Sequence, residues 1–70
     1  MKPDEIAKLT AYLRQALGST VIEVRARPKK DDSAEVYARD EFVGVIYRDD
    51  EDGEDDVSYN FDMAILQSDL

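Results

Sequence analysis

The residues of this 70-residue sequence with the most obvious chemical potential form an acidic run, Asp49–Asp56, with seven carboxylates around Gly53. Carboxylate oxygens are preferred ligands of Ca²⁺, so a divalent-cation site is the first hypothesis. Aligning Gly53 with the invariant glycine of an EF-hand calcium loop puts Arg48 at the first ligand position and Tyr59 at the twelfth, where acids are needed. The EF-hand motif therefore fails. The run predicts a solvated loop, with a weak divalent-cation site as the alternative.

Side chains that catalyse reactions near neutral pH are missing from the sequence. There is no cysteine and no histidine, which excludes disulfides, thiolate nucleophiles and zinc sites built from these residues. A hydrolytic triad would lack a base with a pKa near neutrality, and the three glycines are isolated instead of forming a phosphate-binding loop. Carboxylates in an exposed run keep similar pKa values, because burial does not separate them. We therefore expect no enzymatic activity, no catalytic residue and no cofactor.

Four basic side chains lie close together and could contact phosphates: Arg25, Arg27, Lys29 and Lys30. The sequence pI of about 4.3 is opposite to the basic footprint of a nucleic-acid-binding domain. Charge is also divided along the chain, because residues 1–30 carry a net charge of +4 and residues 31–70 a net charge of −12. We expect the basic cluster to pair with the acidic half inside the molecule, and we expect no binding to nucleic acid.

The elements that position these residues begin with a helix over residues 3–17. Its apolar side chains recur at helical spacing and form one stripe: Ile6, Leu9, Leu13, Ala16 and Leu17. Pro3 is tolerated in the first turn, where its missing N–H would have had no partner. Gly18 follows the stripe and is suited to the left-handed conformation that ends many helices.

After the helix the apolar period changes from 3.6 to 2, which indicates strands. We predict four strands, at residues 20–27, 33–38, 42–48 and 57–66. The last has the strongest alternation, with apolar residues at Val57, Tyr59, Phe61, Met63 and Ile65. A short helix from Asp62 onward is the alternative for this segment.

These elements predict the α+β fold class in a single domain over residues 1–70. Short polar connections favour hairpins, so we expect one N-terminal helix packed on a four-stranded antiparallel β-meander. The acidic loop at 49–56 would join the last two strands.

One helix cannot cover both faces of such a sheet. Alternation in the third strand puts Phe42 and Ile46 on one face, and Val43, Val45 and Tyr47 on the other. We predict that Tyr37, Phe42 and Ile46 share the open face as a protein-interaction patch, because aromatic residues are enriched in interface cores. Scattered surface apolar residues without a role are the alternative.

The composition also predicts a location. A small domain without cysteine is typical of the reducing cytoplasm. Residues 1–5 bring charges and a proline and no apolar run follows, so we expect no signal peptide. No apolar stretch approaches the roughly 20 residues of a membrane helix, and we expect no membrane partner.

Segments spread over nearly the whole chain carry a resemblance to known sequences: Met1–Ile6, Ala26–Pro28, Lys30–Tyr37, Asp40–Val45, Ser58–Phe61, Met63–Leu66 and Asp69–Leu70. In these segments the chain resembles a family of short alphaproteobacterial proteins of unknown function, domain of unknown function number 3126. The resemblance implies a bacterial, stand-alone cytoplasmic protein. It brings no activity and no ligand.

The sequence thus favours a small, non-enzymatic interaction module that binds an unidentified protein partner, or a second copy of itself, through the open sheet face. One alternative is an acidic decoy or regulatory protein that binds a basic partner surface. A weak divalent-cation binder acting through Asp49–Asp56 is the other.

Overall fold

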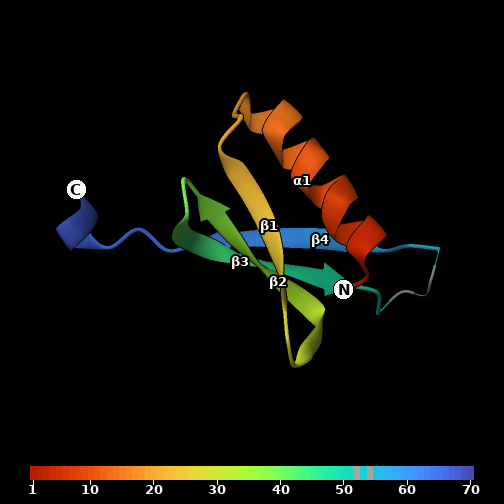
Figure 1. The fold of residues 1–70 in the computed structure, drawn as a ribbon. Coiled ribbons are helices and arrows are strands. Elements are labelled where there is room, and N and C mark those ends of the chain that lie inside the picture. The colour runs from red at the N-terminus through yellow and green to blue at the C-terminus, as the bar shows by residue number, and fades with distance from the viewer. Residues whose placement is uncertain (52, 54) are drawn as a thin grey trace.

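The computed structural model describes residues 1–51, 53 and 55–70. The main elements follow in the order α1 (Pro3–Leu17), β1 (Ile22–Arg27), β2 (Lys30–Ala38), β3 (Glu41–Asp49) and β4 (Ser58–Met63), and a 3-10 helix η1 (Gln67–Asp69) comes last (Figure 1). The strands form one antiparallel sheet in the order β1-β2-β3-β4. The predicted α+β meander with one N-terminal helix is confirmed. Within the described residues, no helix is long and apolar enough to cross a membrane.

Helix α1 has the predicted bounds, and its ends show why. Asp4 and Glu5 lie in the first turn, where the helix dipole favours negative charge, and the backbone N–H of Lys2 donates a hydrogen bond to the Glu5 carboxylate. At the other end Gly18 adopts the left-handed conformation with φ of 61°. This lets the N–H of Ser19 reach the Arg14 carbonyl oxygen at 2.9 Å and closes the last turn.

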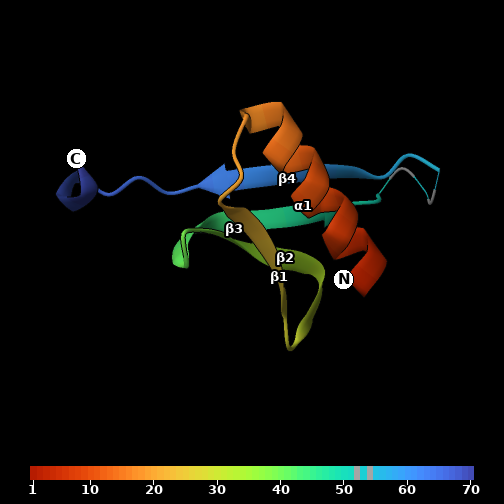
Figure 2. The ribbon, with the colours of Figure 1, turned by 45° about the horizontal axis from the view of Figure 1, so that its top comes forward.

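Helix α1 lies on one face of the sheet and packs closest to β1 (Figure 2). Five buried residues form the core on that face: Ile22, Val24, Ala34, Val36 and Ile46. Ile6, Leu9 and Leu13 of the predicted apolar stripe pack against them. Partial burial of these three side chains holds the helix on the sheet, since burying apolar area is the main favourable term in folding, whereas Ala16 and Leu17 at the end of the predicted stripe are exposed.

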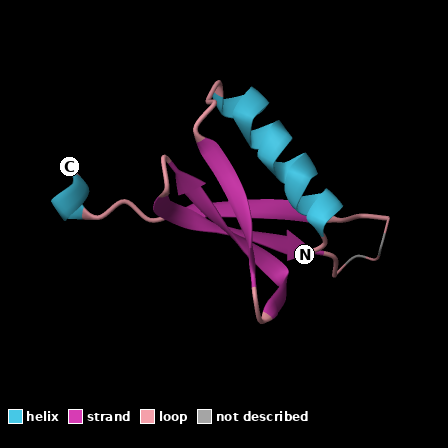
Figure 3. Cartoon of the chain, in the orientation of Figure 1, coloured by secondary structure: helices cyan, strands magenta, loops and turns pink. Residues whose placement is uncertain are grey.

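The strands, coloured magenta in Figure 3, depart from the predicted bounds at several ends. β1 begins at Ile22, two residues later than predicted. β2 begins at Lys30 and not at residue 33, because a tight two-residue turn pairs Arg27 with Lys30 and extends the hairpin into exposed polar residues. β3 is one residue longer than predicted at each end. The polar composition of residues 30–32 therefore concealed an extended hairpin tip, in which the register with β1 shifts after Ala26.

The fourth strand is shorter than predicted. β4 ends at Met63, whereas the alternation predicted a strand through residue 66. Met63 pairs with Gly44, and the next residue of β3, Val43, is the extra residue of a register shift in the sheet. The alternative of a helix from Asp62 is also wrong, because Asp62 is in β4 and only a 3-10 turn, Gln67–Asp69, follows.

A β-bulge in β3 corrects the predicted faces of this strand. Val36 pairs with Gly44, but the next residue, Tyr37, pairs with Phe42, so Val43 is an extra residue in the ladder. An extra residue inverts the alternation. Ile46 therefore lies in the core with 3% of its surface exposed, on the face opposite to Phe42. The prediction that Ile46 belongs to the open face is wrong.

Candidate functional site

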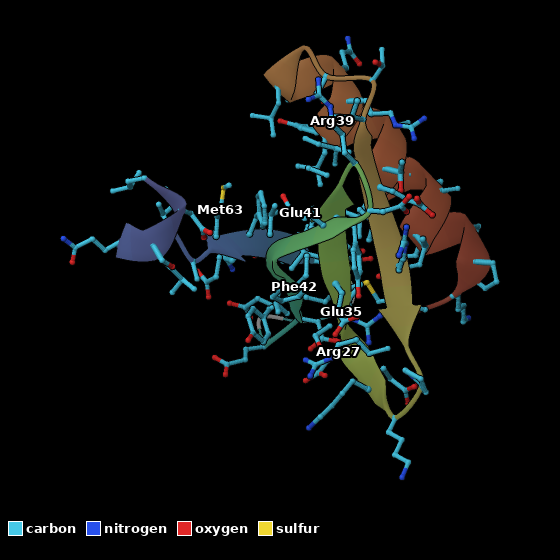
Figure 4. The ribbon with its side chains drawn as sticks, turned by 60° about the vertical axis from the view of Figure 1, so that its left-hand side comes forward. Arg27, Glu35, Arg39, Glu41, Phe42 and Met63 are labelled. Atoms are coloured by element: carbon cyan, nitrogen blue, oxygen red, sulfur yellow. The ribbon has the colours of Figure 1, made fainter. Side chains whose placement is uncertain are left out.

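The open face of the sheet brings together two of the three predicted patch residues. Tyr37 and Phe42 are cross-strand partners, and their rings meet edge to face with centroids 5.8 Å apart. Phe42 is 52% exposed. Figure 4 shows Phe42, Glu35 and Arg27 gathered along the sheet on the side away from α1. Of the three residues predicted to share this face, Tyr37 and Phe42 do so, as a pair of aromatic rings.

Polar partners hold this aromatic pair in place. The Arg25 guanidinium lies over the Tyr37 ring, 4.0 Å from its centroid, and also contacts Glu23 and Asp40. The Tyr37 hydroxyl donates a hydrogen bond to Glu35 at 2.9 Å. This bond to a carboxylate, with some desolvation, raises the pKa of Tyr37. The contact of Arg25 with Asp40 is the kind of internal pairing that the sequence predicted for the basic cluster.

An apolar groove lies on the other face, between α1 and the β3–β4 half of the sheet. Its volume is about 430 Å³, and its apolar walls come from both layers: Leu9, Tyr12 and Leu13 on α1, and Ile46, Tyr59 and Phe61 on the strands. Glu5 and Lys8 also line it. The groove exists because α1 packs against β1 and leaves the β4 side of the sheet incompletely covered. It is large enough to accept apolar side chains from a partner.

Three polar side chains tie the start of α1 to the sheet beside this groove. Arg48 Nη1 donates to both carboxylate oxygens of Glu5 at 3.1 Å, and the Tyr59 hydroxyl donates to Glu5 Oε2. Burial alone would raise the pKa of Glu5, but the bonds from Tyr59, Arg48 and the Lys2 backbone together outweigh it and lower that pKa. The Glu5 carboxylate also raises the pKa of Tyr59. A carboxylate held in this way is a poor base, so the cluster anchors the helix.

Sequence reasoning missed this cluster and the groove. Glu5 lies 43 residues from Arg48 and 54 from Tyr59 along the chain, so no local motif joins them. A partial signal for the groove was present, because Tyr12 lies beside the apolar stripe and widens it toward β4. The alternation from Val57 to Ile65 also supplies more apolar residues than one helix covers.

The acidic loop has few contacts that the structure describes. Asp50 lies 3.7 Å from the Arg48 guanidinium, and the N–H of Glu51 donates to the Asp49 carboxylate at 3.2 Å. The predicted cation segment includes Asp52 and Glu54, which lie outside the described residues. Among the residues that are described, no three acidic side chains gather closely enough to hold a metal ion.

Exposed apolar side chains concentrate near the end of the chain. In the described part of the molecule eleven large apolar side chains are exposed, and six of them belong to residues 57–70: Val57, Tyr59, Met63, Ile65, Leu66 and Leu70. The segment after β4 extends away from the rest of the fold (Figure 1). This surface adjoins the groove, since Tyr59 belongs to both.

Comparison with known proteins places the chain in a family. No curated protein and no solved structure matches it. The model of a family described as "Protein of unknown function (DUF3126)" matches residues 5–69, which is nearly the whole chain. The resemblance to this family noted from the sequence segments is thereby confirmed, and the family description names no activity. The chain belongs to the protein family of unknown function DUF3126.

Proposed function

We propose that this protein is a small, non-enzymatic, cytoplasmic interaction module whose docking surface is the groove between α1 and β4. The single observation that carries the proposal is the groove itself, an apolar hollow bounded by Leu9, Tyr12, Leu13 and Phe61 that the fold leaves open. Concave apolar surfaces with a few polar groups at the edge are where proteins bind partners. Glu5 and Lys8 supply those polar groups.

The open sheet face, where Tyr37 and Phe42 lie, is the weaker candidate for docking. Ile46 lies in the core and not on this face. Polar groups already contact Tyr37 there, because Arg25 lies over its ring and Glu35 accepts a hydrogen bond from its hydroxyl. A partner would have to displace those contacts to reach the rings. The groove walls are mostly apolar, and the polar bonds at the groove join only Glu5 to Arg48 and Tyr59.

The proposal of a non-enzymatic role has support from residue chemistry. The chain has neither histidine nor cysteine, and the Glu5 carboxylate already accepts hydrogen bonds from Arg48 and Tyr59. We likewise propose that nucleic acid is not a partner. Arg25 contacts Glu23 and Asp40, and Arg27 donates to the Ser33 hydroxyl, so these two basic groups are engaged inside the molecule.

Charge offers a second candidate function, a decoy or regulatory protein that binds a basic surface through the acidic loop. Its support is the net charge of −8 and the exposure of Glu51, Asp55 and Asp56. Such binding would weaken steeply as salt screens the charges. Binding through an apolar groove would persist at high salt. Divalent-cation binding by the same loop has less support, because the described acids do not gather into a ligand set.

Partner capture by matched variants tests the groove. Tyr12 and Leu17 are both apolar residues of α1 that are more than half exposed, but only Tyr12 lines the groove. We expect Tyr12→Glu to abolish capture of the native partner at both low and high salt, and Leu17→Glu to leave it unchanged. Equal effects of the two substitutions would overturn the groove as the docking surface. Loss of capture by the unmodified chain at high salt would favour the acidic loop.

A further inference from the structure

We propose that a second copy of this chain docks along β4, so that the two β4 strands pair antiparallel around a twofold axis and the two sheets become continuous. This inference rests on the proposed interaction function and names the partner. It depends on three features of the described residues: the difference between the two edges of the sheet, an apolar alternation that continues past β4, and the position of the groove beside this edge.

The β1 edge of the sheet is protected against pairing. Arg14 Nε donates to the Ile22 carbonyl oxygen at 2.7 Å, and the N–H of Val24 donates to the Thr10 hydroxyl at 3.3 Å, so α1 side chains occupy backbone groups of this edge. The register with β2 also shifts after Ala26, where the pairing moves from Ala34 to Lys30. Bulges, charged side chains and a covering helix are the usual devices that prevent edge-to-edge association.

The β4 edge has fewer of these devices in the part of the chain that the structure describes. Its register with β3 is regular from Ser58 to Met63, and its six residues include one charged side chain, Asp62, and no proline. Among the described residues, no side chain forms a hydrogen bond to the backbone of β4. An edge strand of this kind is a ready template for another strand. Of the two edges of the sheet, β4 is therefore the one built to pair.

The apolar alternation of the sequence is longer than the strand that one chain forms. Apolar residues alternate from Val57 to Ile65, but β4 ends at Met63, beside the bulge at Val43 in β3. Ile65 is left 64% exposed. A second β4 would supply the missing neighbour, so that the strand could continue to Ile65. This accounts for a strand-like pattern where a single copy has no strand.

The side chains on the two faces of β4 favour one register for the pairing of β4 with its copy. Directly opposed residues in an antiparallel sheet share a face, so a pairing centred on Phe61 and its twofold mate opposes Tyr59 to Met63 and Val57 to Ile65. All these pairs are apolar. Tyr59, Phe61 and Met63 lie on the helix side, because their β3 partners share the face of the buried Ile46, and Val57 and Ile65 would follow if the strand continued. On the other side the same register opposes Asn60 to Asp62, a neutral donor facing a carboxylate. The two grooves would then meet beside the twofold axis, because both helices lie on the same face.

Cysteine pairs test both the dimer and its register, and the natural chain has no cysteine to interfere. Asn60 and Asp62 are exposed, so Asn60→Cys and Asp62→Cys should preserve the fold. In the proposed register the thiol introduced by Asn60→Cys in one copy opposes the thiol introduced by Asp62→Cys in the other. Their Cα atoms would lie about 5 Å apart, whereas like positions are about 7–8 Å apart and too distant to bridge.

With oxidised glutathione, we expect a disulfide-linked dimer from a mixture of the two cysteine variants and none from either variant alone. Equal crosslinking in all three samples, or in none, would overturn this register.

Met63→Lys tests the edge without crosslinking, with Leu17→Lys as the control, because the two side chains are 54% and 56% exposed. We expect the dimer dissociation constant to rise at least about tenfold for Met63→Lys and to remain unchanged for Leu17→Lys. A monomeric natural chain whose partner capture still depends on Tyr12 would refute the self-association and leave the proposed function standing. A monomeric natural chain whose partner capture does not depend on Tyr12 would refute both the self-association and the groove as the docking surface.

Discussion

Because of the β-bulge at Val43, we predict different effects for truncation of Ile46 and Phe42, two apolar residues that strict alternation would place on one face. Ile46 is 3% exposed in the core and Phe42 is 52% exposed on the opposite face. We expect Ile46→Ala to cost about 2–3 kcal/mol, at the lower end for core truncations, because the neighbouring groove lets the site relax. Phe42→Ala should cost about 1 kcal/mol, from its edge contact with Tyr37 and partial burial.

These costs are large for a chain of this size, whose total stability is on the order of 5 kcal/mol. Thermal unfolding followed by circular dichroism should lower the Tm by about 10–20 °C for Ile46→Ala and by about 4–8 °C for Phe42→Ala. Urea titration of the same variants gives the free energy of unfolding independently. Equal losses from the two substitutions, or a larger loss from Phe42→Ala, would refute the bulge and the face assignment that follows from it.

Three further predictions concern the positions that support the site. Gly44→Ala should lower the free energy of unfolding, measured by urea titration, by about 2–3 kcal/mol, because a Cβ there would collide with the Asp62 carbonyl and the Phe61 ring. A Cβ at Gly18 meets open space, so Gly18→Ala should lower it by about 1 kcal/mol. A smaller loss for Gly44→Ala than for Gly18→Ala would contradict the close approach of β3 and β4. The Glu5 pKa is lowered below its usual 4.5 in the folded chain, so its stabilising contribution is present above that pH and is lost as the pH falls through the folded pKa. The stability difference between the natural chain and Glu5→Gln should therefore shrink as the pH falls below 4.5, and a constant difference would contradict the role of this carboxylate. Addition of Ca²⁺ to about 1 mM should leave the backbone amide shifts of the acidic loop unchanged, and saturable shifts there would restore the divalent-cation alternative.

The parts of the fold that could be predicted are those with uninterrupted local periodicity. Helix α1 was predicted with its bounds, because Pro3, an apolar stripe and Gly18 all indicate the same ends. The existence of the four strands and their antiparallel order followed from short connections and alternation. Strand ends were less predictable, since pairing with a neighbour decides them. β4 ends at Met63, beside the bulge at Val43 in β3, and the residues around Met63 do not reveal that neighbour.

The candidate site was predictable only in part. Tyr37 and Phe42 were predicted to share a face and do so. Ile46 was misplaced because strict alternation was assumed through Gly44, an isolated glycine of the kind that often marks a bulge, and one extra residue inverts the faces of all residues beyond it. The groove depends on where α1 sits over the sheet, which is a property of tertiary packing. The ties between Glu5 and the residues of β3 and β4 are long-range and leave no local pattern.

Sedimentation of the unmodified chain over a range of concentrations tests the central claim most directly. We expect the measured mass to rise with concentration from 8.0 kDa toward twice that value and to stop there, because a twofold pairing of β4 edges closes on itself. We also expect salt to strengthen the association, since each copy carries a net charge of −8 that salt screens. A mass that stays at one chain at every concentration and salt, or that grows without limit, would contradict pairing through β4.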